Sequence, residues 1–181
     1  MSRKRPPAGE RTSRCGCPRY GSFAAPNTMP EGPEKSILGE RQRRWLRETI
    51  EQSDATFRVV VSPLIFVGPD QGRKGDNHAN DAFCWEGQLL REFFADNDVV
   101  VIGGDRHWQY VSVDPDTGVW EFSCGALADG REGGWDPDDV HPAHRFLAVK
   151  PGFVWAEVDR EDDEPILTIE HRSRTGNVHH R

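Results

Sequence analysis

Residues 99–109 read Val-Val-Val-Ile-Gly-Gly-Asp-Arg-His-Trp-Gln, an apolar run that ends in two glycines and then delivers polar side chains. Its consecutive β-branched residues predict a buried strand over Asp98–Gly103. In open α/β sheets, ligands and catalytic groups collect at the carboxyl ends of strands, and glycine there lets backbone and ligand approach closely. This stretch therefore predicts a functional site at the end of a buried strand.

The segments before this strand alternate between helix and strand. In order, they are predicted as a helix over Gly39–Gln52, a strand over Phe57–Ser62, a loop over Gly68–Asn80 and a helix over Trp85–Ala95. Helix, strand, loop, helix and strand is the order of a layered α/β domain. If the two buried strands run parallel, the helix between them makes a right-handed crossover, and their carboxyl ends open on the same edge of the sheet.

The pattern changes after the central strand. The turn Asp114–Gly118 is expected to join strands over Tyr110–Val113 and Val119–Ser123. Three further antiparallel strands are predicted over Arg145–Lys150, Phe153–Asp159 and Ile166–His171, with an acidic turn over Asp159–Glu164. The predicted fold class is therefore α/β (α+β), ending in antiparallel strands.

Length and charge indicate one domain with a tail. The chain has 181 residues and a net charge of −7, but residues 1–25 carry +5 and the remainder −12. We predict a disordered basic head over residues 1–28, with order beginning between Met29 and Leu38. The head contains no apolar stretch typical of a secretory signal, and the compartment stays open. No transmembrane segment is expected, and the acidic balance argues against a general nucleic-acid surface.

The four cysteines form no recognisable framework. Cys15 and Cys17 lie in the head, whereas Cys84 and Cys124 are isolated. Because no Cys-x-x-Cys pair meets a second such pair, a structural zinc site is not expected.

The strongest candidate site residues are Asp105 and His107. They are two positions apart, which in extended backbone places both side chains on one side. Histidine nitrogen with carboxylate oxygen suits Fe, Zn or Mn, and the intervening Arg106 is a candidate phosphate clamp. The alternative that the residues leave open is a hydrogen-bonded Asp–His pair at a strand end.

Two other segments carry possible ligands. Asp76, Asn77 and His78 follow the first buried strand, and we expect them to lie near Asp105 and His107 if the two strands are parallel neighbours. They are also ordinary turn residues. The similar segment Asp139–His141, with His144 nearby, follows no strand and is expected to be uninvolved. No nucleophile elbow, Walker loop or dinucleotide fingerprint is present.

The stretch Gly103–Tyr110 resembles the last metal-binding block of the PhoD-like alkaline phosphatases, which belong to the calcineurin-like metallophosphoesterase superfamily. Further stretches are similar to the family in the same order, from about Pro26 to the end of the chain. They are Pro26–Pro33, Leu38–Gln42, Val61–Pro63, Val67–Asp70, Asp76–His78 and Glu121–Gly125.

The resemblance implies a fold, a metal site and a substrate class. It implies a metallophosphoesterase β-sandwich flanked by helices, with metal ions (Fe, Ca, Zn or Mn) where strand ends meet, acting on a phosphate ester. His107 matches the second histidine of the superfamily's Gly-His-x-His block, and Asp105 stands at the first, as in PhoD-like proteins. The superfamily's earlier ligand blocks are not found before Gly39. The chain is thus expected to be the C-terminal part of a longer hydrolase domain, over residues 29–181, and inactive in isolation.

Three hypotheses remain at this point. The chain belongs to a metal-dependent phosphoric ester hydrolase, or it is a non-catalytic binding module that keeps part of the fold. In the third hypothesis, the chain uses six of its own acids and histidines for a new single-metal site: Asp76, His78, Asp105, His107, Asp139 and His141.

Overall fold

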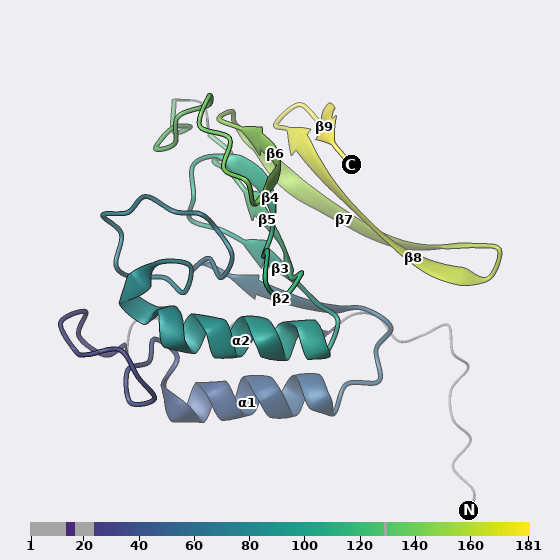
Figure 1. Ribbon diagram of the computed structural model, residues 1–181. Coiled ribbons are helices and arrows are strands. Elements are labelled where there is room, and N and C mark those ends of the chain that lie inside the picture. Colours follow the sequence, from purple (N-terminus) through teal and green to yellow (C-terminus); the bar gives the residue numbers. More distant parts are fainter. Residues whose placement is uncertain (1–13, 17–23, 129) are drawn as a thin grey trace, which may run out of the picture.

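The computed structural model describes residues 14–16, 24–128 and 130–181 (Figure 1). Most of the predicted basic head therefore lies outside the described residues. Within it, Arg14–Gly16 forms the short strand β1. No helix in the described part of the chain has the length and apolarity needed to cross a membrane.

A mixed six-stranded sheet forms the centre of the molecule, in the order β1-β2-β3-β5-β4-β6. Its further strands are β2 (Arg58–Ser62), β3 (Val99–Gly103), β4 (Gln109–Val113), β5 (Trp120–Cys124) and β6 (His144–Ala148). Strands β1, β2, β3 and β5 are parallel, and β4 is antiparallel to both β5 and β6. The two buried strands, β2 and β3, are parallel neighbours, which is the condition under which their following loops were expected to meet.

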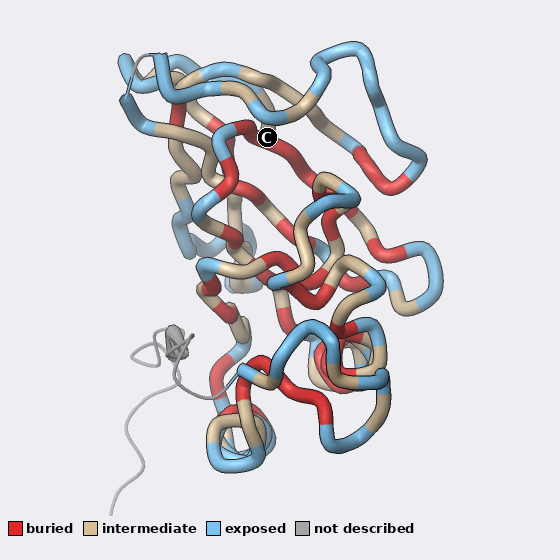
Figure 2. The backbone as a smooth tube through the Cα atoms, turned by 90° about the vertical axis from the view of Figure 1, so that its left-hand side faces the viewer, coloured by how far each residue is buried: buried red, intermediate tan, exposed pale blue. Residues whose placement is uncertain are grey.

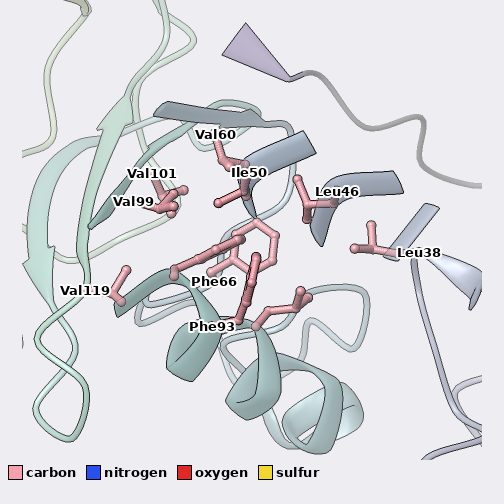
Figure 3. Close-up of a cluster of buried hydrophobic side chains, with 11 residues drawn as sticks. Leu38, Leu46, Ile50, Val60, Phe66, Phe93, Val99, Val101 and Val119 are labelled. Carbon is pink, nitrogen blue, oxygen red and sulfur yellow. The ribbon is translucent and has the colours of Figure 1, made fainter. Parts of the chain in front are cut away.

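Two helices, α1 (Gly39–Glu51) and α2 (Cys84–Asp96), cover one face of this sheet, and the short 3₁₀ helix η1 (Asp81–Phe83) leads into α2 (Figure 1). Alternate residues of β3 face the helices, as the burial of Val99 and Val101 shows. They pack with Leu46 and Ile50 of α1 and with Phe93 of α2 in the main apolar core (Figure 3). Burial of these side chains supplies the main driving force that holds the helices on the sheet.

A second sheet contains β7 (Gly152–Glu161), β8 (Glu164–Ser173) and β9 (Val178–His180), all antiparallel. Strands β7 and β8 form a long hairpin that projects from the rest of the molecule (Figure 1). Asp162 and Asp163 both have positive φ, 48° and 67°, as a two-residue type I′ turn requires. The predicted longer acidic turn was wrong, because the strands continue to Glu161 and from Glu164.

The sequence also grouped three late strands together, whereas the structure separates them. Strand β6 belongs to the central sheet, where it pairs with β4, and β9 completes the second sheet. Pairing partners so distant in sequence leave no local signal. The fold class, with mixed sheets and few helices, is the predicted α+β arrangement.

The second sheet contacts the central sheet through β7 and β8, which meet its strands β5 and β4. The buried His171 of β8 donates from Nε2 to the carbonyl of Ser123, and Gln109 Nε2 donates to the carbonyl of Arg172. Beyond these contacts, the hairpin and the central sheet border an open groove of about 730 Å³ that Val100, Trp120 and Phe122 help to line. Buried backbone is concentrated in the central sheet, whereas residues 156–164 at the projecting end of the β7–β8 hairpin are exposed (Figure 2).

Candidate functional site

The carboxyl end of β3 presents Asp105 and His107 at the surface, and both residues are exposed. Asp105 has a φ of 64°, in the left-handed region that non-glycine residues rarely adopt. The extended backbone expected at this position is therefore not found. The chain turns at Asp105, so the spacing of two residues does not by itself align the two side chains.

Arg106, between them, points into the protein and is only 3% exposed. Its Nη1 donates to Oδ2 of Asp105 at 2.7 Å, and its Nη2 donates to Oδ2 of Asp70 at 2.5 Å. Both terminal nitrogens of the guanidinium are therefore engaged by carboxylates of this chain. The geometry suits a side chain that holds Asp105 in place better than one that clamps a phosphate in this state.

Asp70 joins the two segments that follow β2 and β3. It is nearly buried, and its Oδ2 also accepts a hydrogen bond from Nδ2 of Asn77 at 3.0 Å. Asn77 and Arg106 thus share one carboxylate oxygen, and the loop after β2 reaches the end of β3. Asp70 was not among the site residues predicted from the sequence. The one signal for it was the Val67–Asp70 stretch among the family-like motifs.

The remaining loop candidates divide between surface and interior. Asp76 is exposed, whereas the ring of His78 is fully buried and stacks on Phe66 at 4.6 Å between centroids. His78 Nε2 lies 3.0 Å from Oε2 of the buried Glu86 in α2. The His78 ring is therefore packed in the interior, away from solvent.

Glu86 anchors the start of the α1 region as well as His78. Its carboxylate accepts hydrogen bonds from the Ser36 hydroxyl and from the backbone N–H of Ile37. Burial by itself would raise the pKa of Glu86, but the hydrogen bonds from His78, Ser36 and Ile37 lower it below its usual value. This buried acid ties the loop before α1 to the loop after β2.

The segment Asp139–His141 is exposed, and His144 is buried beside Tyr110 and Trp135. Burial lowers the pKa of His144 to about 4, with the neighbouring His141 as a second cause. His144 is therefore neutral at pH 7.

The residues described here do not complete a metal centre. Across residues 14–16, 24–128 and 130–181, no group of three or more His, Cys, Asp or Glu side chains converges to hold an ion. A two-metal phosphoesterase site holds its ions about 3.5–4 Å apart, and so needs more ligands than Asp105 and His107 supply. The single-metal site that the sequence left open does not form either.

Comparison with known proteins relates the chain to phosphatases. The family model described as PhoD-like phosphatase matches residues 10–173. The match begins earlier than Pro26, where the motifs had placed its start, and it ends at Ser173, the last residue of β8. No curated protein sequence matches the chain.

Three solved structures share the fold. A PhoD structure is 18% identical with a TM-score of 0.53, and covers 78% of this chain and 35% of its own length. GAP50, the anchor in the inner membrane complex of Plasmodium, is 17% identical with a TM-score of 0.55, and the match covers 79% of this chain and 41% of GAP50. The purple acid phosphatase PPD1 from yellow lupin is 12% identical with a TM-score of 0.56, and the match covers 78% of this chain and 28% of PPD1. The chain thus spans less than half the length of each of these proteins.

Proposed function

This chain belongs to the PhoD-like phosphatase family, and from that premise we propose that it supplies part of the active site of a metal-dependent phosphoric ester hydrolase. In this proposal His107 and Asp105 are metal ligands at the carboxyl edge of the central sheet. Arg106, Asp70 and Asn77 support that edge. The ion would be Fe, Ca, Zn or Mn, and the substrate a phosphate ester.

One observation carries the proposal. Two parallel neighbouring strands, β2 and β3, deliver their following loops to one place, where Asp70 bonds both Arg106 and Asn77. This is the edge at which open α/β sheets collect ligands and catalytic groups. The exposed Asp105 and His107 stand on the same loop as Arg106, so chemistry that needs solvent and substrate access is available to them.

The described residues supply only two of the ligands that such a site needs. The part that these known structures share with this chain is 28–41% of their own length. We therefore infer that further ligands come from sequence outside the described part, and that this chain alone does not turn over phosphate esters.

A second candidate function is a non-catalytic binding module that keeps part of the fold. It is favoured by the incomplete ligand set and by the guanidinium of Arg106, whose terminal nitrogens are occupied by Asp70 and Asp105. Binding of inorganic phosphate without hydrolysis, in a form that contains the missing ligands, would support this reading.

The test is a chimera. The matched part of a PhoD structure is replaced by this chain, so that the remainder supplies the other ligands. We expect metal-dependent hydrolysis of a chromogenic phosphate ester, abolished in His107→Ala by loss of a ligand. His141→Ala is the matched control, because it removes an exposed histidine with the same Asp-x-His spacing and should leave activity intact. A folded chimera that binds metal but hydrolyses neither a monoester nor a diester would contradict the proposal.

A further inference from the structure

Glu121 of β5 is a fully buried carboxylate that accepts four hydrogen bonds. Oε2 receives the backbone N–H groups of Phe66, at 2.6 Å, and Val67, at 3.1 Å. Oε1 receives the backbone N–H of Gly68, at 3.0 Å, and the hydroxyl of Tyr110, at 2.7 Å. Three consecutive backbone donors from the loop after β2 therefore converge on one side chain from a different strand.

The chemistry of these donors requires a carboxylate. A glutamine offers a single accepting oxygen and an NH₂ group, which would face N–H or O–H donors where Glu121 now accepts. A buried charge is expensive unless hydrogen bonds compensate it, and here the four donors do so. Burial, with the charge of Glu121 as second cause, raises the pKa of Tyr110 well above its usual value, so its hydroxyl stays a donor.

The fixed loop leads directly to the candidate site. Gly68 is followed by Pro69 and Asp70, and Asp70 carries the hydrogen bonds to Arg106 and Asn77. Arg106 in turn bonds Asp105 at the surface. The charges of Arg106 and Asp70 both act on Tyr110, which places the Glu121–Tyr110 pair within electrostatic range of this network.

We infer that Glu121 is a positioning residue of the candidate site. It holds the backbone of residues 66–68 so that Asp70 meets Arg106, and through Arg106 it sets the place of Asp105. Glu121 itself is not exposed, so it acts only through these residues. The expected effect of Glu121 on catalysis rests on the proposed function, whereas its expected effect on the position of Arg106 does not.

The first measurement uses this chain alone. The guanidinium resonances of Arg106 are recorded by NMR at low temperature and identified by their loss in Arg106→Lys. We expect Glu121→Gln to remain folded but to lose the resolved signals, because Asp70 no longer holds the guanidinium. The matched control is Val119→Ala, which removes buried core volume just before β5 and should keep them. Retention in Glu121→Gln, or equal loss in Val119→Ala, overturns the inference.

If Glu121→Gln does not fold, hydrogen exchange on the unsubstituted chain still tests the role of Glu121. Hydrogen exchange at the amides of Phe66, Val67 and Gly68 should be slower, on the order of 100-fold, than at the exposed Gly72 and Arg73. This protection should persist in Asp70→Asn, because the bonds to Glu121 do not depend on Asp70. Exchange as fast as at Gly72 would refute the role of Glu121.

The last measurement uses the active chimera. Glu121→Gln should lower kcat/KM by about tenfold or more, since small displacements of site residues are costly, whereas Val119→Ala should leave it near the parent value. An equal effect of both variants overturns the catalytic part of the inference. A chimera that is inactive without any substitution instead refutes the proposed function, and the Arg106 signals then still decide the positioning role.

Discussion

Burial changes the protonation of single polar residues in this protein, and His171 is an example. Its ring is fully buried, and Nε2 donates to the Ser123 carbonyl. Burial lowers the pKa of His171 to about 4, and the charges of His180 and His179 act in the same direction. The folded protein therefore keeps this ring neutral at pH values where an unfolded chain would protonate it.

The stability of the chain should consequently fall as the pH drops from about 6.5 to about 4, because the unfolded state takes up the proton first. The change in pKa corresponds to roughly 3 kcal/mol for His171. His171→Gln, which keeps a donor for Ser123 but does not titrate, should remove this share. Urea unfolding at pH 7 and pH 4 measures it.

His144, also buried and with a pKa of about 4, provides an independent comparison. His144→Gln should remove a similar share of the pH dependence. A His171→Gln chain that loses stability with falling pH as steeply as the unchanged chain would show that His171 is not the titrating group.

At the scale of elements, helix α2 lies very close to the loop after β2 at Gly87. A Cβ placed on Gly87 would lie 2.1 Å from the carbonyl oxygen of His78, which is backbone and cannot move aside cheaply. Replacing glycine by alanine inside a helix normally stabilises it by about 1 kcal/mol. The contact reverses that expectation here.

Gly87→Ala should therefore destabilise the chain by about 1–3 kcal/mol, because α2 must move away from the loop that carries His78. Gly72→Ala is the control: nothing lies within 4 Å of a Cβ there, and its effect should be small. Thermal or urea unfolding compares the two. A stabilised Gly87→Ala chain would mean that α2 does not sit this close to the loop.

The β4–β5 hairpin depends on Asp114. Its Oδ1 accepts hydrogen bonds from the backbone N–H groups of Asp116 and Thr117 and from the Thr117 hydroxyl. Its Oδ2 lies 3.1 Å from Nε of Arg91 in α2. The turn and the helix are thus joined by one carboxylate.

Asp114→Ala should cost about 2 kcal/mol of unfolding free energy, since it leaves the turn donors without their acceptor and removes the carboxylate that is paired with Arg91. The exposed Asp116 in the same turn offers a matched control, and Asp116→Ala should change stability by no more than about 0.5 kcal/mol. Equal effects of the two substitutions would show that the hydrogen bonds of Asp114 add nothing to stability.

At the scale of the whole molecule, two features support the proposal that this chain supplies part of a catalytic site. The chain supplies two candidate ligands at the site edge, and the face of the central sheet away from the helices leaves Trp120 45% exposed beside an open groove. The related structures extend well beyond the shared part.

The purified chain should bind Fe, Zn, Mn or Ca weakly and should show negligible hydrolysis of a chromogenic phosphomonoester or phosphodiester. The reason is the ligand count: a partly liganded ion lacks the second ion that stabilises the leaving oxygen. Metal analysis of the purified protein and activity assays with each ion provide the measurement. Robust turnover that disappears in His107→Ala would prove that this chain builds a complete site from its own residues.

The amino-acid sequence by itself determined the local elements and their order. The apolar periodicities predicted α1, α2, β2 and β3 to within one or two residues at each end, and the Asp114–Gly118 turn predicted the β4–β5 hairpin. The run that ends in Gly103 and Gly104 also placed Asp105 and His107 at a strand end. These features depend on residues close in sequence, which is why periodicity and turn chemistry reveal them.

Only the tertiary structure decided which polar residues act together. Glu121 reaches Phe66 across 55 positions, Arg106 reaches Asp70 across 36, and neither pairing leaves a local pattern. The same holds for the burial of His78 against Glu86 and for the assignment of β6 to the central sheet. A buried carboxylate and an exposed one look alike in sequence, because the difference lies in the donors that the folded chain brings to them.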